Sequence, residues 1–145
     1  MILNSLYALL CSLGFGILFS IRGRKLFFAS LGGGIGWYFY LLCNKYTHSI
    51  VFSLFIATIS LSIYSEIVAR IFKAPVTTFL VSALLPLVPG AGMYYTMYES
   101  IIGNATKSLS LGIETILSAG AIAVATIIVS SITKVVIVIK NKFIS

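Results

Sequence analysis

Long apolar segments separated by short polar turns make up almost the whole chain. A membrane-spanning helix requires about 20 consecutive apolar residues. Polar and charged residues divide the chain into five segments close to this length, at residues 2–20, 26–43, 49–69, 79–98 and 111–133. The pattern therefore predicts an all-α integral membrane protein with about five transmembrane helices. Because the turns are short, we expect residues 1–145 to form a single transmembrane domain in a lipid bilayer.

The fourth apolar segment, residues 79–98, contains Pro86-Leu-Val-Pro89-Gly90-Ala-Gly92 near its middle. Each proline removes a backbone donor and clashes with the preceding turn, so we expect the helix to break here. Backbone groups freed at membrane depth must bond to protein, water or a ligand, so we expect the broken span to line a cavity, as broken spans do in transporters. We expect a second half-helix to begin at Gly90 and to direct its first N–H groups toward a substrate carboxylate. Pro89, Gly90 and Gly92 are therefore candidate substrate-binding residues.

The composition supports a membrane protein and excludes a soluble one. The chain is 59% hydrophobic and 9% charged, and its mean hydropathy is +1.10. A soluble domain of average composition contains about 25% charged residues. The net charge of +7 would point to nucleic acid in a soluble protein. Here the basic residues mark membrane turns instead, and we expect no nucleic-acid partner.

The basic residues are distributed unequally between the two sides of the predicted bundle. Only Lys45 and Lys107 lie in the turns after the second and fourth segments. Eight others follow the first, third and fifth segments: Arg22, Arg24, Lys25, Arg70, Lys73, Lys134, Lys140 and Lys142. Cytoplasmic loops carry an excess of Lys and Arg. We therefore expect a multi-pass protein of the cell membrane, with its N-terminus outside and its C-terminus in the cytosol.

The residue types required for common enzymatic chemistry are scarce. The chain has one histidine and no aspartate, so no Ser-His-Asp arrangement exists. No group of residues has the spacing of a metal site. The two cysteines, Cys11 and Cys43, fall in membrane segments at different depths, where they are expected to be small core residues. The sequence therefore predicts neither an enzyme nor a cofactor or metal site.

A glycine block, Gly32-Gly33-Gly34-Ile-Gly36, lies in the second segment. It follows no strand, which excludes a dinucleotide-binding fingerprint. Paired Gly and Pro interruptions in two apolar segments mark the binding sites of transporters, so Gly33 and Gly34 are further candidate substrate-binding residues. The alternative is that these small residues only allow neighbouring helices to pack closely.

Glu66 and Arg70 lie four residues apart near the cytosolic end of the third segment, so they share one helix face. The planar guanidinium of Arg70 is suited to binding a substrate carboxylate bidentately. Glu66 would then serve as its counter-ion or as a proton acceptor that couples transport to a proton gradient. The alternative is an interfacial ion pair whose arginine only fixes the membrane topology.

Four residues near the outer surface have two possible roles each. Tyr94 is a candidate to donate its hydroxyl to a substrate, or it belongs to an outer aromatic belt. Glu99, Glu114 and His48 are either proton-relay groups or solvated helix ends. A carboxylate such as Glu114 is also favourable near a helix N-terminus.

Several of these motifs together resemble one transporter family. Glu66-Ile-Val-Ala-Arg70, Pro75, Pro86-Leu-Val-Pro89-Gly90-Ala-Gly-Met-Tyr94 and Gly32-Gly-Gly-Ile-Gly36-Trp37 resemble the short membrane subunit of the threonine/serine exporter (ThrE) family. The turn that reads Ser20-Ile-Arg-Gly23 departs from relatives, which often hold a proline there.

The resemblance implies a subunit of a secondary exporter of small amino or carboxylic acids. The substrates it implies are threonine and serine or a dicarboxylate such as succinate. It also implies a larger membrane subunit that carries a cytosolic domain. Five helices that begin outside would form one half of an inverted-repeat transporter. The alternatives are a structural or assembly subunit of a membrane complex and a small pore former.

Overall fold

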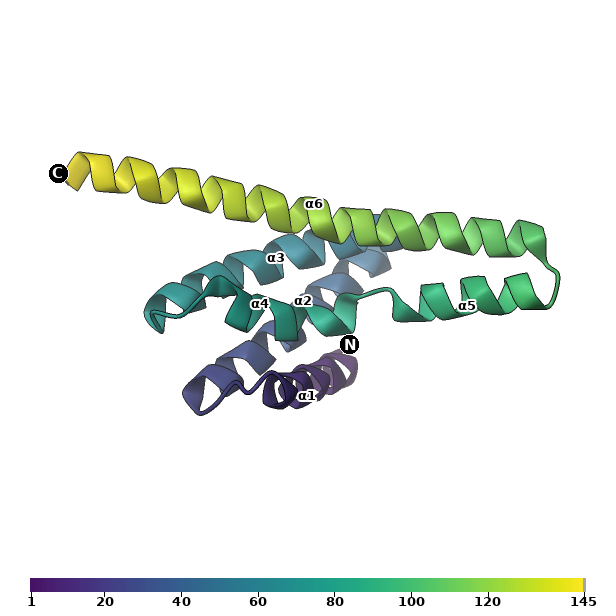
Figure 1. Cartoon of the computed structure of the whole chain (residues 1–145), viewed down its shortest axis with the longest axis horizontal. Coiled ribbons are helices and arrows are strands. Elements are labelled where there is room, and N and C mark those ends of the chain that lie inside the picture. The colour runs from purple at the N-terminus through teal and green to yellow at the C-terminus, as the bar shows by residue number, and fades with distance from the viewer. Residues whose placement is uncertain (145) are drawn as a thin grey trace.

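The computed structural model describes the backbone of residues 1–144 and the side chains of residues 1–139. The chain forms α1 (Ile2–Leu18), α2 (Arg24–Thr47), α3 (Ile50–Ile71), α4 (Val76–Leu84), the 3₁₀ turn η1 (Leu85–Leu87), α5 (Gly90–Ile101) and α6 (Ala105–Ile144) (Figure 1). No strand occurs within residues 1–144, which confirms the all-α prediction. The side chains of Lys140 and Lys142, which entered the charge comparison, lie outside the described residues.

Three helices, α2, α3 and α6, are long and apolar enough to cross a membrane. The segment formed by α4 with η1 makes a fourth candidate span together with α5, and the two parts meet at an angle of 43°. The predicted break in the fourth segment is therefore confirmed. α1 has 17 residues and a length of about 25 Å, somewhat less than the hydrocarbon core of about 30 Å. Composition and length thus support three to four of the five predicted spans.

The boundaries predicted for the last helix are wrong. The apolar pattern indicated residues 111–133, whereas α6 extends over 40 residues from Ala105 to Ile144. Gly103 adopts a φ of +87° in the turn before α6, where a left-handed conformation favours glycine. No proline follows in the chain, so nothing in the sequence breaks the helix where the apolar segment ends.

α2 packs against α1, α3 and α4, and α6 packs along α3. α5 packs against α6, and Figure 1 shows α5 and the first part of α6 as a hairpin that extends away from α1–α4, while the rest of α6 runs back along the bundle. Hydrogen bonds and an ion pair at the closed end fix the hairpin. The Glu99 carboxylate accepts a hydrogen bond from Asn104 Nδ2 at 3.0 Å and lies 2.6 Å from Lys107 Nζ. Ser108 Oγ donates to the carbonyl oxygen of Thr96 at 2.9 Å.

Two apolar clusters form the core of the bundle. One cluster lies beside the break and consists of Leu54, Ala57, Leu61, Ala83, Leu87 and Ile122. The other consists of Ile21, Ala29, Val68, Ala69 and Phe79, so it joins the α1–α2 turn to the α3–α4 turn. The basic residues of these two turns consequently lie at the same end of the bundle, in agreement with the predicted alternation of charge.

The glycines of α2 allow close packing on two sides of this helix. A Cβ atom on Gly33 would overlap Ser12 of α1, and one on Gly34 would lie 3.3 Å from the Cβ of Leu9. On the other side, a Cβ on Gly32 would lie 3.1 Å from the Cβ of Ala83. These contacts support the interpretation of the glycine block as a packing surface.

Candidate functional site

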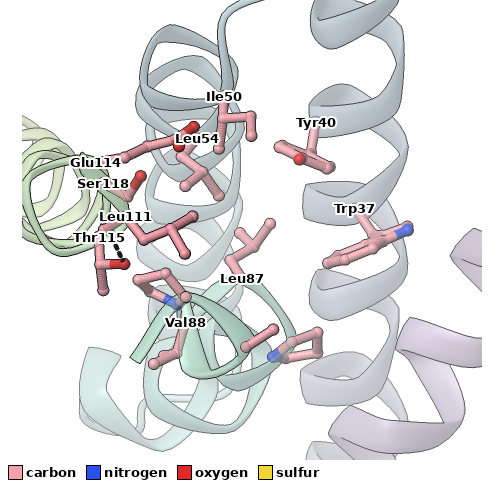
Figure 2. A pocket seen from close by; sticks show the side chains of 14 residues that line it. Trp37, Tyr40, Ile50, Leu54, Leu87, Val88, Leu111, Glu114, Thr115 and Ser118 are labelled. Atoms are coloured by element: carbon pink, nitrogen blue, oxygen red, sulfur yellow. Dashed lines mark hydrogen bonds between the residues drawn. The ribbon is translucent and has the colours of Figure 1, made fainter. Parts of the chain in front are cut away.

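A cavity of about 380 Å³ lies beside the break between η1 and α5. Its volume falls within the range of about 300–1,000 Å³ that is typical of small-molecule sites. Figure 2 shows α2, α3 and α6 around the cavity, with the broken segment closing one side. The lining residues are Trp37, Tyr40, Ile50, Leu54, Pro86, Leu87, Val88, Pro89, Ala91, Gly92, Leu111, Glu114, Thr115 and Ser118. The prediction that the broken span lines a cavity is therefore confirmed.

The local sequence explains the shape of the break. Pro86 and Pro89 lack N–H groups, and Val88 between them is extended, with φ −62° and ψ 129°. The N–H of Gly90 donates to the carbonyl oxygen of Val88 at 2.7 Å, and α5 begins at Gly90, as predicted. Among the described residues, no side chain caps α5.

The start of α5 presents hydrogen-bond donors to the cavity. The N–H groups of the first turn of a helix have no helical carbonyl to bond. In α5 these groups include those of Ala91 and Gly92, and both residues line the cavity. A helix N-terminus also carries a partial positive charge. This wall of the cavity is therefore suited to a carboxylate.

The other walls of the cavity carry hydroxyl groups and one carboxylate. Glu114, Thr115 and Ser118 of α6 line the cavity, together with Tyr40 of α2 (Figure 2). Thr115 Oγ1 donates to the carbonyl oxygen of Leu111 at 2.7 Å, so its lone pairs remain free to accept. The ion pairs within the described residues involve Glu66 and Glu99, so Glu114 has no cationic partner among them.

Gly92 and Gly90 differ in the space that is available for a Cβ atom. A Cβ atom on Gly92 would overlap Thr115 Oγ1, so glycine is required where α5 approaches α6. A Cβ on Gly90 would have no atom within 4 Å, and Gly90 does not line the cavity. Of the residues predicted for the site in this segment, Pro89 and Gly92 therefore line the cavity. Gly90 does not line it, but it is the first residue of α5.

Other residues that the sequence singled out lie elsewhere. Arg70 Nη2 is 3.1 Å from Glu66 Oε2, which confirms the shared helix face. Arg70 follows Leu54 by 16 residues, or about 24 Å along α3, so the pair is remote from the cavity. Tyr94 is 64% exposed and stacks against Tyr98, with ring centroids 6.3 Å apart. The cavity lining does not include Arg70, Glu66, Tyr94 or Tyr98, and it does not include Gly33 or Gly34.

Sequence reasoning did not single out Trp37, Tyr40 or Thr115 as site residues, and it left the role of Glu114 open. A carboxylate inside the fifth apolar segment was a usable signal, because charged residues within membrane segments are expensive and often functional. The aromatic residues of α2 carried no comparable signal, since their place at the cavity depends on how the helices pack.

A protein-family model described as "Threonine/Serine exporter, ThrE" matches residues 4–132. The chain belongs to the threonine/serine exporter family. The ThrE match includes the broken span, all the lining residues and most of α6. The family comprises membrane exporters of threonine and serine. The apolar helices agree with this and indicate a multi-pass membrane protein. No curated protein and no solved structure matched the chain.

Proposed function

We propose that this chain is one subunit of a two-component secondary exporter of small amino acids, and that the cavity at the break is its part of the substrate site. One observation carries the proposal: the start of α5 and the carboxylate of Glu114 line the same cavity, and neither has a side-chain partner among the described residues. These two features have opposite charge preferences.

A zwitterionic amino acid fits both features at once. Its carboxylate would accept hydrogen bonds from the N–H groups of Ala91 and Gly92, where the helix terminus favours an anion. Its ammonium group would pair with Glu114, and the hydroxyl of threonine or serine would bond to a hydroxyl such as that of Ser118. A dicarboxylate such as succinate would bring a second negative charge toward Glu114, so the site favours an amino acid.

The larger membrane subunit is proposed to complete the site. α5 leaves the bundle with α6 as its packing partner, and the described residues enclose the cavity only in part. We propose that residues 1–145 form one five-span transmembrane domain, with the N-terminus outside, and pair with an inverted half in the partner. In this arrangement the basic turns face the cytosol, and Arg70 with Glu66 lies at the cytosolic entrance.

Reconstitution into liposomes tests this proposal. Because a site between halves needs both halves, the chain alone should show no threonine flux. Addition of the larger subunit should produce saturable flux that excess serine inhibits. The measurement is uptake of radiolabelled threonine, with empty liposomes and the partner alone as controls.

Two results would contradict the proposal. Saturable threonine flux by this chain alone would remove the need for a partner. Leakage of uncharged solutes through the chain alone would instead support a small pore former. A purely structural subunit would be indicated if variants of the break assembled with the partner and exported threonine normally.

A further inference from the structure

Three hydroxyl groups on α3 are buried without a hydrogen-bond partner. Thr58, Ser62 and Ser65 are 0%, 2% and 0% exposed, and none of their hydroxyl oxygens bonds to another described atom. Only two other buried side-chain polar atoms among the described residues lack a partner, on Ser12 and Trp37. The unsatisfied groups are thus concentrated on one helix.

Neighbouring hydroxyls on the same helix behave differently. Ser53 Oγ donates to the carbonyl oxygen of Ser49 at 2.6 Å, and Ser60 Oγ donates to that of Ile56 at 3.0 Å. This bond to the preceding turn is the usual way to satisfy a serine within an apolar helix. An unpartnered hydroxyl away from water is costly. The three exceptions therefore point to a partner that binds them in another state of the transporter.

The three residues lie on one face of α3 in a defined position. Their spacing of four and three residues places them one above another. Thr58 follows the cavity residue Leu54 by one turn, and Ser65 directly precedes Glu66, which pairs with Arg70 at the end of α3. The hydroxyl stripe, defined as Thr58, Ser62 and Ser65, therefore connects the level of the cavity with the cytosolic end.

The surrounding helices close the hydroxyl stripe in this structure. α2, α4 and α6 all pack against α3. α4 adds a further buried hydroxyl, Ser82, whose Oγ lies as far as 3.5 Å from its acceptor, the carbonyl oxygen of Phe79. Small hydroxyl residues also occur at helix contacts as hydrogen-bonding groups. That explanation does not apply here, because the hydroxyls of the stripe form no hydrogen bond to another helix within the described residues.

We propose that the hydroxyl stripe lines the cytosolic half of the substrate path and becomes hydrated when the transporter opens toward the cytosol. This inference rests on the proposed transport function. Polar groups of this kind would replace the hydration of a zwitterion as it moves from the cytosolic end of α3 to the cavity. In the structure described here the path is closed, since all three residues are buried.

Cysteine accessibility tests the inference. In a background with Cys11→Ser and Cys43→Ser, Ser62→Cys and Ser65→Cys are compared with Ile63→Cys and Ile67→Cys. The control positions lie at similar depth, but they are on the exposed face of α3 that would contact lipid. A membrane-impermeant cationic thiol reagent is added to inside-out vesicles that contain the assembled complex.

The stripe cysteines should react about tenfold faster than the lipid-facing ones, because a thiol in apolar surroundings forms little thiolate. Threonine should slow this reaction. Equal rates at the stripe and control positions would overturn the inference. Fast labelling that threonine does not slow would support the hydrated path while rejecting threonine as its substrate.

A second pair of variants tests the inference independently, in case the cysteine substitutions disturb folding. Ser62→Ala and Ser65→Ala remove hydroxyls that form no bond in this structure, so the thermal stability of the complex should be unchanged or raised. Threonine export should nevertheless fall. Unchanged export by both alanine variants would overturn the inference, since the hydroxyls would then serve no purpose in transport.

Discussion

Replacement of Pro89 and Gly90 together by alanine should reduce threonine export about tenfold or more while the complex still assembles. A continuous helix through these positions would take up the N–H groups that Ala91 and Gly92 present to the cavity. A hydrogen bond to a charged group contributes about 1.5–3 kcal/mol, so the loss of one or two such bonds accounts for this decrease. Alanine at position 90 also meets no steric obstacle.

The same variant should be at least as stable as the wild type. In a helix interior proline costs about 3 kcal/mol and glycine about 1 kcal/mol relative to alanine. Complex yield, thermal stability and export are measured on one preparation. Gly120→Ala is the matched control, because a Cβ on Gly120 would likewise have no atom within 4 Å and Gly120 does not line the cavity. Normal export with raised stability would mean that the break is an incidental kink.

Glu114→Gln should lower kcat/KM for threonine by about 10- to 100-fold. The variant keeps the shape and hydrogen-bonding capacity of the side chain but removes the charge that would pair with the substrate ammonium. Hydrogen bonds to charged groups contribute about 1.5–3 kcal/mol, and about 1.4 kcal/mol corresponds to a factor of ten. The measurement is the concentration dependence of threonine flux in proteoliposomes.

Two comparisons make this prediction specific. Glu114→Asp retains the charge and should lose less activity than Glu114→Gln. Succinate, which lacks an ammonium group, should bind the Gln variant no more weakly than the wild type. If Glu114 carried a coupling proton instead, Glu114→Gln would abolish uphill export while threonine affinity stayed normal. Unchanged affinity together with unchanged uphill export would exclude Glu114 from the site.

The break in the fourth span could be predicted because its cause is local. Pro86 and Pro89 cannot donate backbone hydrogen bonds, whatever surrounds them, and α5 begins at Gly90 as expected. The end of α6 could not be predicted in this way. Hydropathy reports where a segment can leave the membrane, whereas a helix ends only where a residue or contact interrupts it.

The remaining walls of the cavity depend on tertiary packing. Tyr40 and Glu114 are 74 positions apart in the chain, and only the packing of α2 and α6 around α3 brings both to one cavity. For Gly33 the sequence allowed both a site role and a packing role. Its close approach to Ser12 supports packing, and we assign it no contact with substrate.

The spacing of Arg70 and Glu66 predicted their contact but not its function. Their spacing correctly predicted a contact, which is observed at 3.1 Å. An exposed pair at this spacing contributes only about 0.2–0.5 kcal/mol to a helix. The Arg70 side chain is 47% exposed and that of Glu66 is 12% exposed, so the pair is only partly buried and adds little to stability. Its proposed place at the cytosolic entrance follows from its position at the end of α3.

If the cavity at the break binds the transported amino acid, substrate should protect its lining from chemical labelling. The decisive quantity is the labelling rate of Val88→Cys in the assembled complex, in the Cys11→Ser, Cys43→Ser background. Val88 lines the cavity, whereas Val81 lies on the same segment outside it and is equally exposed, at 44%. Threonine should slow labelling of Val88→Cys, with half its effect near the KM for export, and leave Val81→Cys unaffected. A Val88→Cys rate that stays constant at threonine concentrations that saturate export would show that the amino acid does not bind in this cavity.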